Sequence, residues 1–404
     1  KNAGANVIVL EKMPTYGGNS AINGGILTAT GCPQQKKHGI KDSPELLAHD
    51  MLVAGLYMNQ PEKVKLVASH ALSNYEWTVN YLGVEYNPDA IGQEGGHSVP
   101  RYVFTKNGSG SGITSKEKQK LDELGVKIRT RTYVKHIFRN DDGRVVGIEV
   151  REGYRFPNEN SGRTKFIAAK KGVVLCYGGF SCDVPYRTMQ NPMLTAKFDS
   201  TNQPGATAEL WRETSRIGCA QVQNDWIQCT PWNNPNEKGM GIGWTFAQSA
   251  AAEWGLWVAT NGKRFVNELA NRKVRADAIM VEQSEGRRAV AICNRANTAA
   301  FQKARPGMME KLLERKIIKQ YQTLDDIAAA DLKKTVDAFN KSVAAKHDPE
   351  FGRYINNEQK PMTEGPWYAE EMSPKIHHCM GGLVTDMDAR VIDIVDGKPI
   401  PGLF

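Results

Sequence analysis

The chain has 404 residues, which is too long for one small hydrophobic core and favours two domains. Hydrophobic residues make up 40% of it, and no apolar run reaches the roughly 18 residues that a membrane-spanning helix needs. The formal net charge is +8, but the basic residues are spread along the chain and no nucleic-acid recognition motif accompanies them. We therefore expect a globular protein with neither a membrane span nor a nucleic-acid partner.

The seven cysteines are scattered, and their spacings include no C-x-x-C pair and no C-x-x-C-H haem attachment motif. Reduced thiols are expected, and they fit a periplasmic or otherwise extracytoplasmic location in a bacterium as well as the alternative, the cytoplasm.

The first residues resemble the second half of a dinucleotide-binding unit. An apolar run, Val7 to Leu10, predicts a buried strand that ends in Glu11, where such units place an acid for a ribose. The loop "YGGNSAINGGILTA" (16–29) then contains two Gly pairs. Glycines let a backbone approach a flat or phosphate-bearing ligand closely, although a merely flexible loop would have the same composition.

Further along, Ser43 followed by Pro44 predicts a helix start. Residues 125–150 predict successive strands, the last two joined by an Asp-Gly turn. The run "KGVVLCYGGF" (171–180) predicts a buried strand that leads into a Gly pair, and the apolar positions of "LKKTVDAFNKSV" share one helical face.

Two features remain ambiguous at this level. Five tryptophans fall within 32 positions, at 226, 232, 244, 254 and 257, and they suit either a domain core or an apolar binding pocket. The stretch "KIHHCMGGL" (375–383) has residue types that bind metals or haem, but a metal site needs further ligands at a suitable spacing, and none is evident. We expect no metal.

Five motifs in order resemble the FAD-dependent fumarate reductase/succinate dehydrogenase flavoproteins, most nearly the soluble flavocytochrome c type. They are "VIVLEK…GGNS…GG", "GGF", "NQPGATAEL", "NGKRFVNELANR" and "HHCMGGLVTD". The resemblance implies an α/β fold with a Rossmann-like FAD-binding domain (1–225 and 378–404) interrupted by an α+β capping domain (226–377). It also implies a G-x-G-x-x-G strand upstream of residue 1 and a substrate-binding arginine beyond residue 404.

The same resemblance assigns the cofactor, FAD, to a set of positions. They are Glu11, Lys12, Gly17, Gly18, Asn19, Ser20, Gly24, Gly25, Val134, Gly178 and Gly179. Gly18 is followed by Asn-Ser, and no position resembles the family's covalent-flavin histidine, so we expect non-covalent FAD.

Reduction of an alkene beside a carboxylate needs a hydride from the flavin N5, groups that hold the carboxylate, and an acid that protonates the α-carbon. By resemblance Arg272 is this acid and His378 binds a substrate carboxylate, while His377 is structural.

The chain departs from the family at the other end of the substrate. "QCTP" (228–231) replaces "QAHP", so Thr230 stands where a carboxylate-binding histidine would be. Ala247 and Gln248 begin a segment that lacks the family's Thr-Glu-x-x-Arg groups. With Gln228, these positions form the rest of the predicted substrate site. A second carboxylate would be desolvated there without partners, which argues against fumarate.

We therefore predict an ene-reductase for an α,β-unsaturated monocarboxylate, either arylacrylate- or urocanate-like or a small enoate. Proton delivery to Arg272 is then rerouted through Gln248 and water, or through Glu268, Arg275 or Asp277. The alternatives are a dehydrogenase acting on a saturated acid or ketone and an electron-transfer subunit without ene chemistry. The electron donor would be a c-type cytochrome, a haem domain or a flavin reductase.

Overall fold

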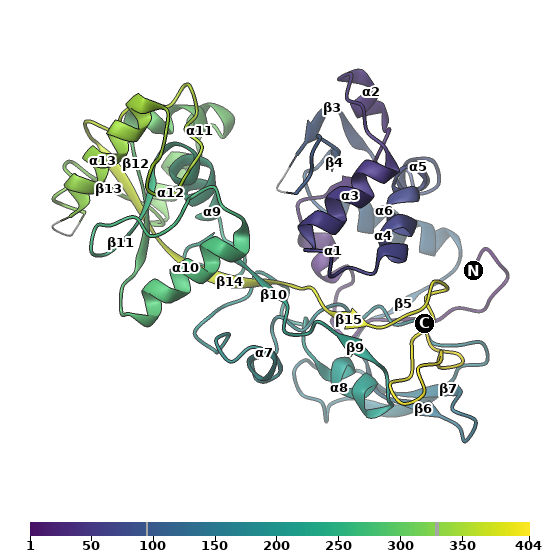
Figure 1. Ribbon diagram of the computed structural model, residues 1–404. Coiled ribbons are helices and arrows are strands. Elements are labelled where there is room, and N and C mark those ends of the chain that lie inside the picture. Colours follow the sequence, from purple (N-terminus) through teal and green to yellow (C-terminus); the bar gives the residue numbers. More distant parts are fainter. Residues whose placement is uncertain (94–95, 328–330) are drawn as a thin grey trace. The chain divides into compact units, whose positions relative to one another are not determined.

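The computed structural model describes residues 1–93, 96–327 and 331–404, which form two compact units (Figure 1). Unit 1 comprises Lys1–Gly178, Ala208–Val222 and Leu383–Phe404. Unit 2 comprises Gly179–Thr207 and Gln223–Gly382. No helix in the described ranges is both long and apolar enough to cross a membrane.

Unit 1 contains one parallel pair and two antiparallel sheets. Strand β1 (Val9–Leu10) runs parallel to β5 (Ile128–Arg129). One antiparallel sheet has the order β2 (Ile26–Thr28), β4 (Tyr102–Thr105), β3 (Tyr86–Gly92), and the other β6 (Thr132–Arg139), β7 (Val145–Glu152), β8 (Arg163–Ala168). Two short strands, β9 (Gln221–Val222) and β15 (Gly382–Leu383), also pair, and the boundary between the units falls within β15. Strands β6 and β7 confirm the predicted hairpin.

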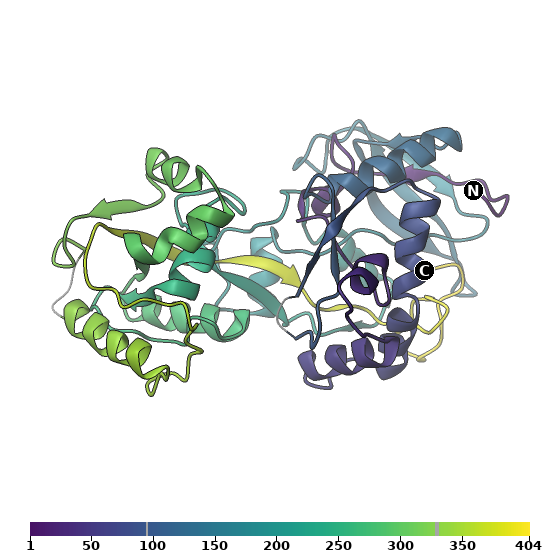
Figure 2. The same cartoon turned by 90° about the horizontal axis from the view of Figure 1, so that it is seen from above.

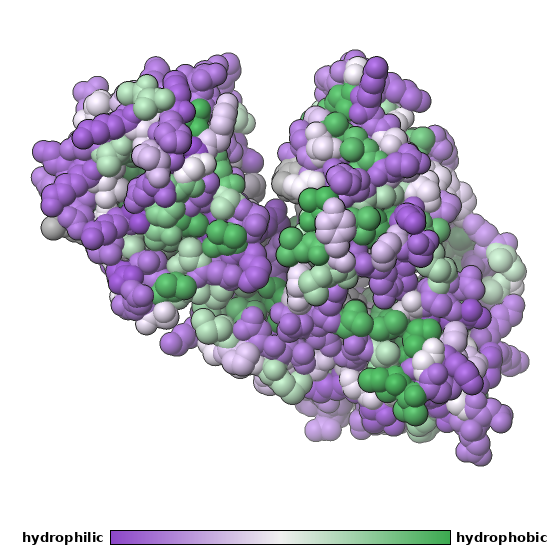
Figure 3. Space-filling view, viewed as in Figure 1, coloured by the Kyte–Doolittle hydropathy of each residue, from purple (hydrophilic) through white to green (hydrophobic). Residues whose placement is uncertain are grey.

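The helices of unit 1 are mostly short. In the space-filling view, apolar residues form small patches among the hydrophilic ones (Figure 3). The helices are α1 (Gly18–Ile22), α2 (Pro33–Lys37), α3 (Pro44–Ala54), α4 (Pro61–Ser69), α5 (Ala71–Asn80), α6 (Ser111–Glu123) and α8 (Glu209–Arg216). In α3 the Ser43 hydroxyl oxygen accepts a hydrogen bond from the Leu46 N–H at 3.2 Å, which confirms the predicted helix start.

Two strands that the sequence predicts as buried are shorter and more exposed in the structure. Val7 and Ile8 are 42% and 48% exposed, and β1 begins only at Val9. Within 171–177 only Val173 forms a bridge, to Leu403, while Val174 is 70% exposed. Strand β1 pairs with β5 and Val173 with Leu403, and among the described residues neither segment has a second strand on its other edge.

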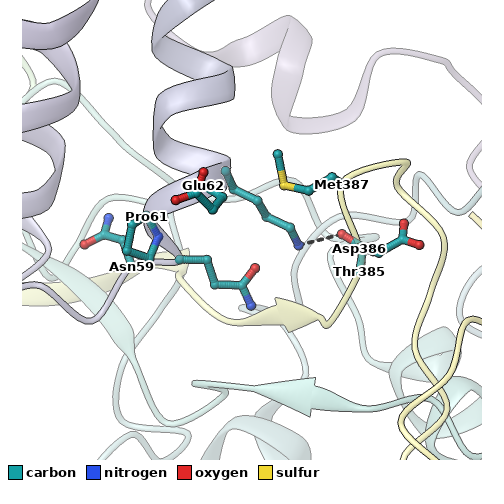
Figure 4. A pocket seen from close by; sticks show the side chains of 8 residues that line it. Asn59, Pro61, Glu62, Thr385, Asp386 and Met387 are labelled. Atoms are coloured by element: carbon teal, nitrogen blue, oxygen red, sulfur yellow. Dashed lines mark hydrogen bonds between the residues drawn. The ribbon is translucent and has the colours of Figure 1, made fainter.

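The last residues of the chain contact helix α4 within unit 1 (Figure 4). The ammonium of Lys63 donates a hydrogen bond to the Thr385 hydroxyl at 2.7 Å, and burial lowers the pKa of this lysine. A cavity of about 370 Å³ opens between the two segments, lined by Asn59, Gln60, Pro61, Glu62, Lys63, Thr385, Asp386 and Met387.

Unit 2 is built on an antiparallel sheet with the order β10 (Ile227–Asn233), β14 (Trp367–Cys379), β12 (Ala289–Asn294), β11 (Leu256–Ala259). Strand β13 (Lys319–Tyr321) also pairs with β14. The long β14 runs through the middle of this sheet in both ribbon views (Figures 1 and 2). It spans 13 residues, so one strand carries both core residues and the His377–His378 pair at its far end.

Helices of unit 2 pack on this sheet and bury its apolar side chains. They are α9 (Trp244–Phe246), the π-helix η1 (Ala247–Ala252), α10 (Arg272–Ser284), the 3₁₀-helix η2 (Arg295–Thr298), α11 (Ala299–Ala304), α12 (Met308–Glu314) and α13 (Leu332–Ala345). The short helix α7 (Val184–Gln190) also belongs to unit 2. The predicted face of α13 is confirmed, since Leu332, Val336, Phe339 and Val343 are all at most 2% exposed. Trp257, at 0%, and Trp232, at 6%, lie in the larger core cluster.

Candidate active site

Arg272 is the first residue of α10, and its position follows from the local sequence. The preceding Asn271 caps the helix by accepting a hydrogen bond from the Val274 N–H at 3.0 Å. Helix α10 packs on β10 through a face that includes Ala276 and Ile279. The guanidinium of Arg272 is therefore held at the positive end of the helix dipole, where a cation is disfavoured.

The side chain of Arg272 contacts strand β10. Its Nη1 donates a hydrogen bond to the Gln228 Oε1 at 3.3 Å, and its Cζ lies 5.2 Å from the centroid of the Trp232 ring. Gln228 in turn faces His378, its partner residue in the β10–β14 register. The structure thus brings Arg272, Gln228 and His378 together on one part of unit 2.

The two histidines differ in how they are held. The Nδ1 of His377 lies 2.6 Å from the Thr201 hydroxyl, and the carbonyl of His377 accepts from the Asn202 amide at 2.7 Å. Burial, then the neighbouring His378 and Arg272, lower the pKa of His377 to about 3. The ring of His378 reaches solvent, yet burial and the charge of Arg272 lower its pKa as well. Both imidazoles are therefore neutral at pH 7.

A second arginine of α10, Arg275, lies on the buried face of the helix. Its Nη1 donates to the Gln248 Oε1 at 2.7 Å and to the Glu268 carbonyl at 2.9 Å. Gln248 comes from η1, and π-helical turns of this kind are frequent at functional sites. Gln248 thus contacts Arg275, which lies three positions after Arg272 on α10.

The carboxylates suggested as proton routes are engaged elsewhere. The Glu268 carboxylate binds Arg264 through two hydrogen bonds of 2.9 and 2.8 Å and lies 3.4 Å from Arg353. Asp277 pairs with Lys273 at 2.6 Å. Glu268 therefore fixes the segment that leads into α10 rather than contacting Arg272 through its carboxylate.

Two positions of the predicted substrate site are buried instead of lining the surface. Thr230 is 1% exposed, and its hydroxyl is engaged with Asn233 and the carbonyl of Lys375. Ala247 is 0% exposed, and its carbonyl accepts from the Trp257 indole at 3.0 Å. The structure does not bring these two side chains to the surface beside Arg272.

In unit 1, Glu11 lies at the end of the parallel strand β1. Its Oε1 accepts from the Met13 N–H at 2.7 Å, and its carbonyl accepts from the Thr132 N–H at 2.9 Å, which places it beside β6. The β6–β7 register shifts between Val134 and His136, so backbone groups there leave the ladder. Lys12 is paired with Glu209 at 2.9 Å.

The glycine-rich loop is shaped by its own packing as well as by any ligand. Gly17 has φ +99°, and a Cβ there would lie 2.7 Å from that of Ala21. Gly25 has φ +65°, and a Cβ would clash with the Ser109 backbone at 2.6 Å. By contrast, a Cβ on Gly178 (φ +71°) or Gly24 would meet no backbone within 4 Å. Asn19 and Ser20 lie in α1 between the two Gly pairs.

Gly179 begins unit 2 and packs against the end of β14. A Cβ on it would lie 3.1 Å from the Cys379 sulfur, which accepts from the Phe180 N–H at 3.3 Å. Among the described side chains, no three His, Cys, Asp or Glu gather closely enough to hold a metal ion.

Comparison with known proteins identifies the family of this chain. A family model described as an FAD binding domain matches residues 1–404. The acrylate reductase flavoprotein subunit of Shewanella woodyi is 35% identical over 99% of this chain and 79% of its own length. The chain belongs to the fumarate reductase-like FAD flavoproteins.

Further matches agree with this assignment. The urocanate reductase of Eggerthella lenta is 31% identical to the flavoprotein over 100% of the chain, which spans 65% of that relative. The open conformation of a flavocytochrome c3 fumarate reductase superposes with a TM-score of 0.80 at 29% identity, covering 100% of this chain and 68% of that one. The predicted α/β FAD-binding fold with a capping domain is confirmed.

The residues of unit 1 fit the cofactor, FAD. A carboxylate fixed at the carboxyl end of a parallel strand, as in Glu11, is where a dinucleotide ribose is bound. The open side of Gly178 leaves room for a flat ring close to the backbone. The bulge at Val134 offers backbone groups for a base.

The buried hydrogen bonds of Arg275 and Arg264 were not predicted from the sequence. Arg264 makes four hydrogen bonds to Glu268 and Asp348 while its side chain is 1% exposed. Arg264 and Glu268 do not lie on a helix, so their spacing of four residues gave no signal for this pair. Asp348 lies 84 positions away, and only the fold brings it to Arg264.

Proposed function

We propose that the flavoprotein reduces the carbon–carbon double bond of an α,β-unsaturated monocarboxylate. The observation that carries this proposal is the cluster of Arg272, Gln228 and His378, which offers a proton donor and neutral hydrogen-bond donors to one carboxylate. Relatives named acrylate, urocanate and fumarate reductases support it. The chain spans 79% and 65% of the first two, so the activity of the whole protein is part of the proposal.

Arg272 is proposed as the acid that protonates the α-carbon. Reduced FAD, when bound, supplies a hydride to the β-carbon. An N–H bond of Arg272 breaks and a C–H bond forms at the α-carbon, which leaves a neutral guanidine. The position of Arg272 at the first residue of α10 favours this loss of charge, because the helix dipole disfavours a cation there.

His378 is proposed to bind the substrate carboxylate. Its lowered pKa keeps the imidazole neutral, with one N–H to donate. A neutral donor adds no charge that would compete with Arg272 for the carboxylate. Gln228, hydrogen-bonded to Arg272, is proposed to hold the guanidinium in the orientation that the transfer needs.

The other end of the substrate is proposed to be small and uncharged. The hydroxyl of Thr230 is engaged inside the unit, and Ala247 offers only a methyl group, which is itself buried. A second carboxylate would lack partners at both positions. Because Trp232 and Trp257 belong to the core, a small enoate such as acrylate is favoured over an arylacrylate.

The test is anaerobic reduction of the protein with dithionite, followed by addition of acrylate, cinnamate, urocanate or fumarate. Flavin reoxidation by acrylate but not by fumarate, with the saturated acid propionate as the control, is the expected result. Reoxidation by none of the enoates would contradict the proposal and favour the electron-transfer alternative. The names of the relatives favour reduction over the dehydrogenase alternative.

Three finer points belong to the same proposal. FAD is bound without a covalent link, since Asn19 and Ser20 follow Gly18 where a linking histidine would be needed. Acid precipitation should therefore release all the flavin into the supernatant.

The electron donor is a cytochrome, a haem domain or a flavin reductase, which flavin reduction by each purified donor would distinguish. A periplasmic rather than cytoplasmic location is tested by cell fractionation.

A further inference from the structure

Arg275 is a buried cation to which the proposed reaction assigns no task. It lies on the inner face of α10 and is 6% exposed. Its Cζ lies 4.7 Å from the ring centroid of Trp232 and 5.3 Å from that of Trp257. Aromatic faces stabilise a cation without neutralising it, so this environment accepts the charge and preserves it.

The hydrogen bonds of Arg275 likewise leave its charge uncompensated. Its Nη1 donates to the neutral amide oxygen of Gln248 and to the backbone carbonyl of Glu268. Within the described ranges no carboxylate lies at salt-bridge distance from it, and its Nε has no hydrogen-bond partner. The nearest acid, Glu268, has its carboxylate engaged with Arg264 and Arg353.

The positive charge of Arg275 lies beside that of Arg272. The two arginines are three positions apart on one helix, so they are neighbours on its surface, and both guanidinium groups lie over the ring of Trp232. Both also lie in the first turn of a 13-residue helix, where the dipole disfavours cations. After burial, the charge of Arg272 is the next contribution that lowers the pKa of Arg275, so the two charges interact.

We propose that Arg275 is a positioning residue that places an uncompensated positive charge beside Arg272, where this charge favours the transfer of the proton from Arg272 to the substrate. Arg275 itself transfers no proton: the N–H bond that breaks belongs to Arg272 and the C–H bond forms at the α-carbon. The fixed positive charge also stabilises the negative charge that builds on the substrate during hydride addition. This inference rests on the proposed function.

Two histidines and one ion pair are among the groups near the two arginines. His377 and His378 face Arg272 from β14, and both have lowered pKa values and are neutral at pH 7. On α10, Lys273 and Asp277 pair with each other at 2.6 Å. Burial, and then the charge of Arg272, lower the pKa of Arg275 to about 10, so it remains charged at neutral pH.

The test compares Arg275→Met and Arg275→Lys in the protein with FAD bound. Dithionite-reduced protein is mixed with acrylate in a stopped-flow instrument, and the rate of flavin reoxidation is followed at several concentrations. Removal of the charge in Arg275→Met should lower the maximal rate at least about tenfold while the half-saturating concentration changes less than about threefold. Arg275→Lys should recover most of the rate at pH 7.

A matched control is Lys273→Met, which removes an exposed charge from the same helix and should change the rate less than about twofold. Binding of propionate to the oxidised protein, measured by calorimetry, should stay within about threefold in all three variants. This measurement does not depend on turnover, so it distinguishes a loss of proton transfer from a loss of substrate binding.

The pH profile supplies a second criterion, which holds even if Arg275→Met does not fold. An amine loses its proton at lower pH than a guanidinium, so the alkaline limb of Arg275→Lys should shift to lower pH than in the wild type. An unshifted limb, equal rates for wild type and Arg275→Met, or equal losses in both variants would overturn the inference. Failure of the wild type with every enoate would instead overturn the proposed function.

Discussion

The Nη1 of Arg272 donates a hydrogen bond to the Oε1 of Gln228 across 3.3 Å, linking the start of α10 to strand β10. Because β10 is paired with β14, this bond also fixes the guanidinium relative to His378. The neutral amide of Gln228 therefore helps to orient the proposed acid. A neutral acceptor can orient a guanidinium without raising its proton affinity as strongly as a carboxylate would.

The hydrogen bond between Arg272 and Gln228 predicts that two substitutions of Gln228 lower the rate by different amounts. Gln228→Leu removes the acceptor and should lower the maximal rate of acrylate reduction about tenfold, the equivalent of one hydrogen bond to a charged group. Gln228→Glu places a negative charge beside Arg272, which makes it a weaker acid and repels the substrate carboxylate, so its loss should be larger. Equal rates for Gln228→Glu and the wild type would contradict the assigned role.

Arg272→Gln should abolish reduction while leaving FAD in place. The variant keeps a hydrogen-bonding group on a shorter side chain, but its amide N–H is too weak an acid to supply the proton, so the turnover rate should fall by about a thousandfold or more. The flavin-to-protein ratio and the rate of flavin reduction by dithionite should match the wild type, since Arg272 lies in unit 2 and the residues fitted to the adenosine end of FAD lie in unit 1. Substantial residual turnover would assign the proton to another group.

The lowered pKa of His377 predicts how the free energy of unfolding depends on pH. Its folded-state pKa of about 3 lies below the unfolded value of about 6.5, so between these limits the unfolded chain holds an extra proton. The free energy of unfolding should therefore fall as the pH is lowered through this window. Between pH 7 and pH 5 this single group should account for about 1 to 2 kcal/mol.

The measurement is urea unfolding at both pH values. In His377→Gln the stability lost between pH 7 and pH 5 should be smaller than in the wild type by that amount. The control is His49→Gln, which removes an exposed histidine of α3, and its pH dependence is compared with that of His377→Gln. Identical pH dependence in His377→Gln and the wild type would show that His377 already holds its proton in the folded state.

Local signals in the sequence predicted the elements that depend on neighbouring residues. Ser43 caps α3 because a hydroxyl before a proline-initiated helix needs only that helix, and the apolar face of α13 follows from its period. Motifs in order likewise predicted the family and brought Arg272 and His378 into one site. These features required no knowledge of distant contacts.

The parts that could not be predicted depend on contacts between distant segments. The hydroxyl of Thr230 is engaged with Asn233 and Lys375 because β10 pairs with β14, a register that the sequence does not state. The environment of Arg275 is formed by tryptophans and by Gln248, 27 positions away. A charged residue on an apolar helix face indicates burial, but its partners come from the fold.

The buried ion network behind Arg272 leads to a prediction about stability. Glu268 binds Arg264 and lies 3.4 Å from Arg353, and all three side chains are at most 1% exposed. In Glu268→Gln both arginines keep their charge but lose a buried carboxylate, which should destabilise unit 2 by about 3 to 5 kcal/mol. Guanidinium chloride unfolding monitored by tryptophan fluorescence measures this, because Trp257 lies beside Glu268.

Glu350 provides the matched control for that measurement. Its carboxylate lies 3.4 Å from the same Arg264, but its side chain is 53% exposed, so solvent replaces it readily. Glu350→Gln should cost less than about 1 kcal/mol. Equal losses in the two variants would mean that water reaches Glu268. In that case the segment leading to Arg272 would not be fixed by the buried pair, and Glu268→Gln should leave the rate of acrylate reduction unchanged.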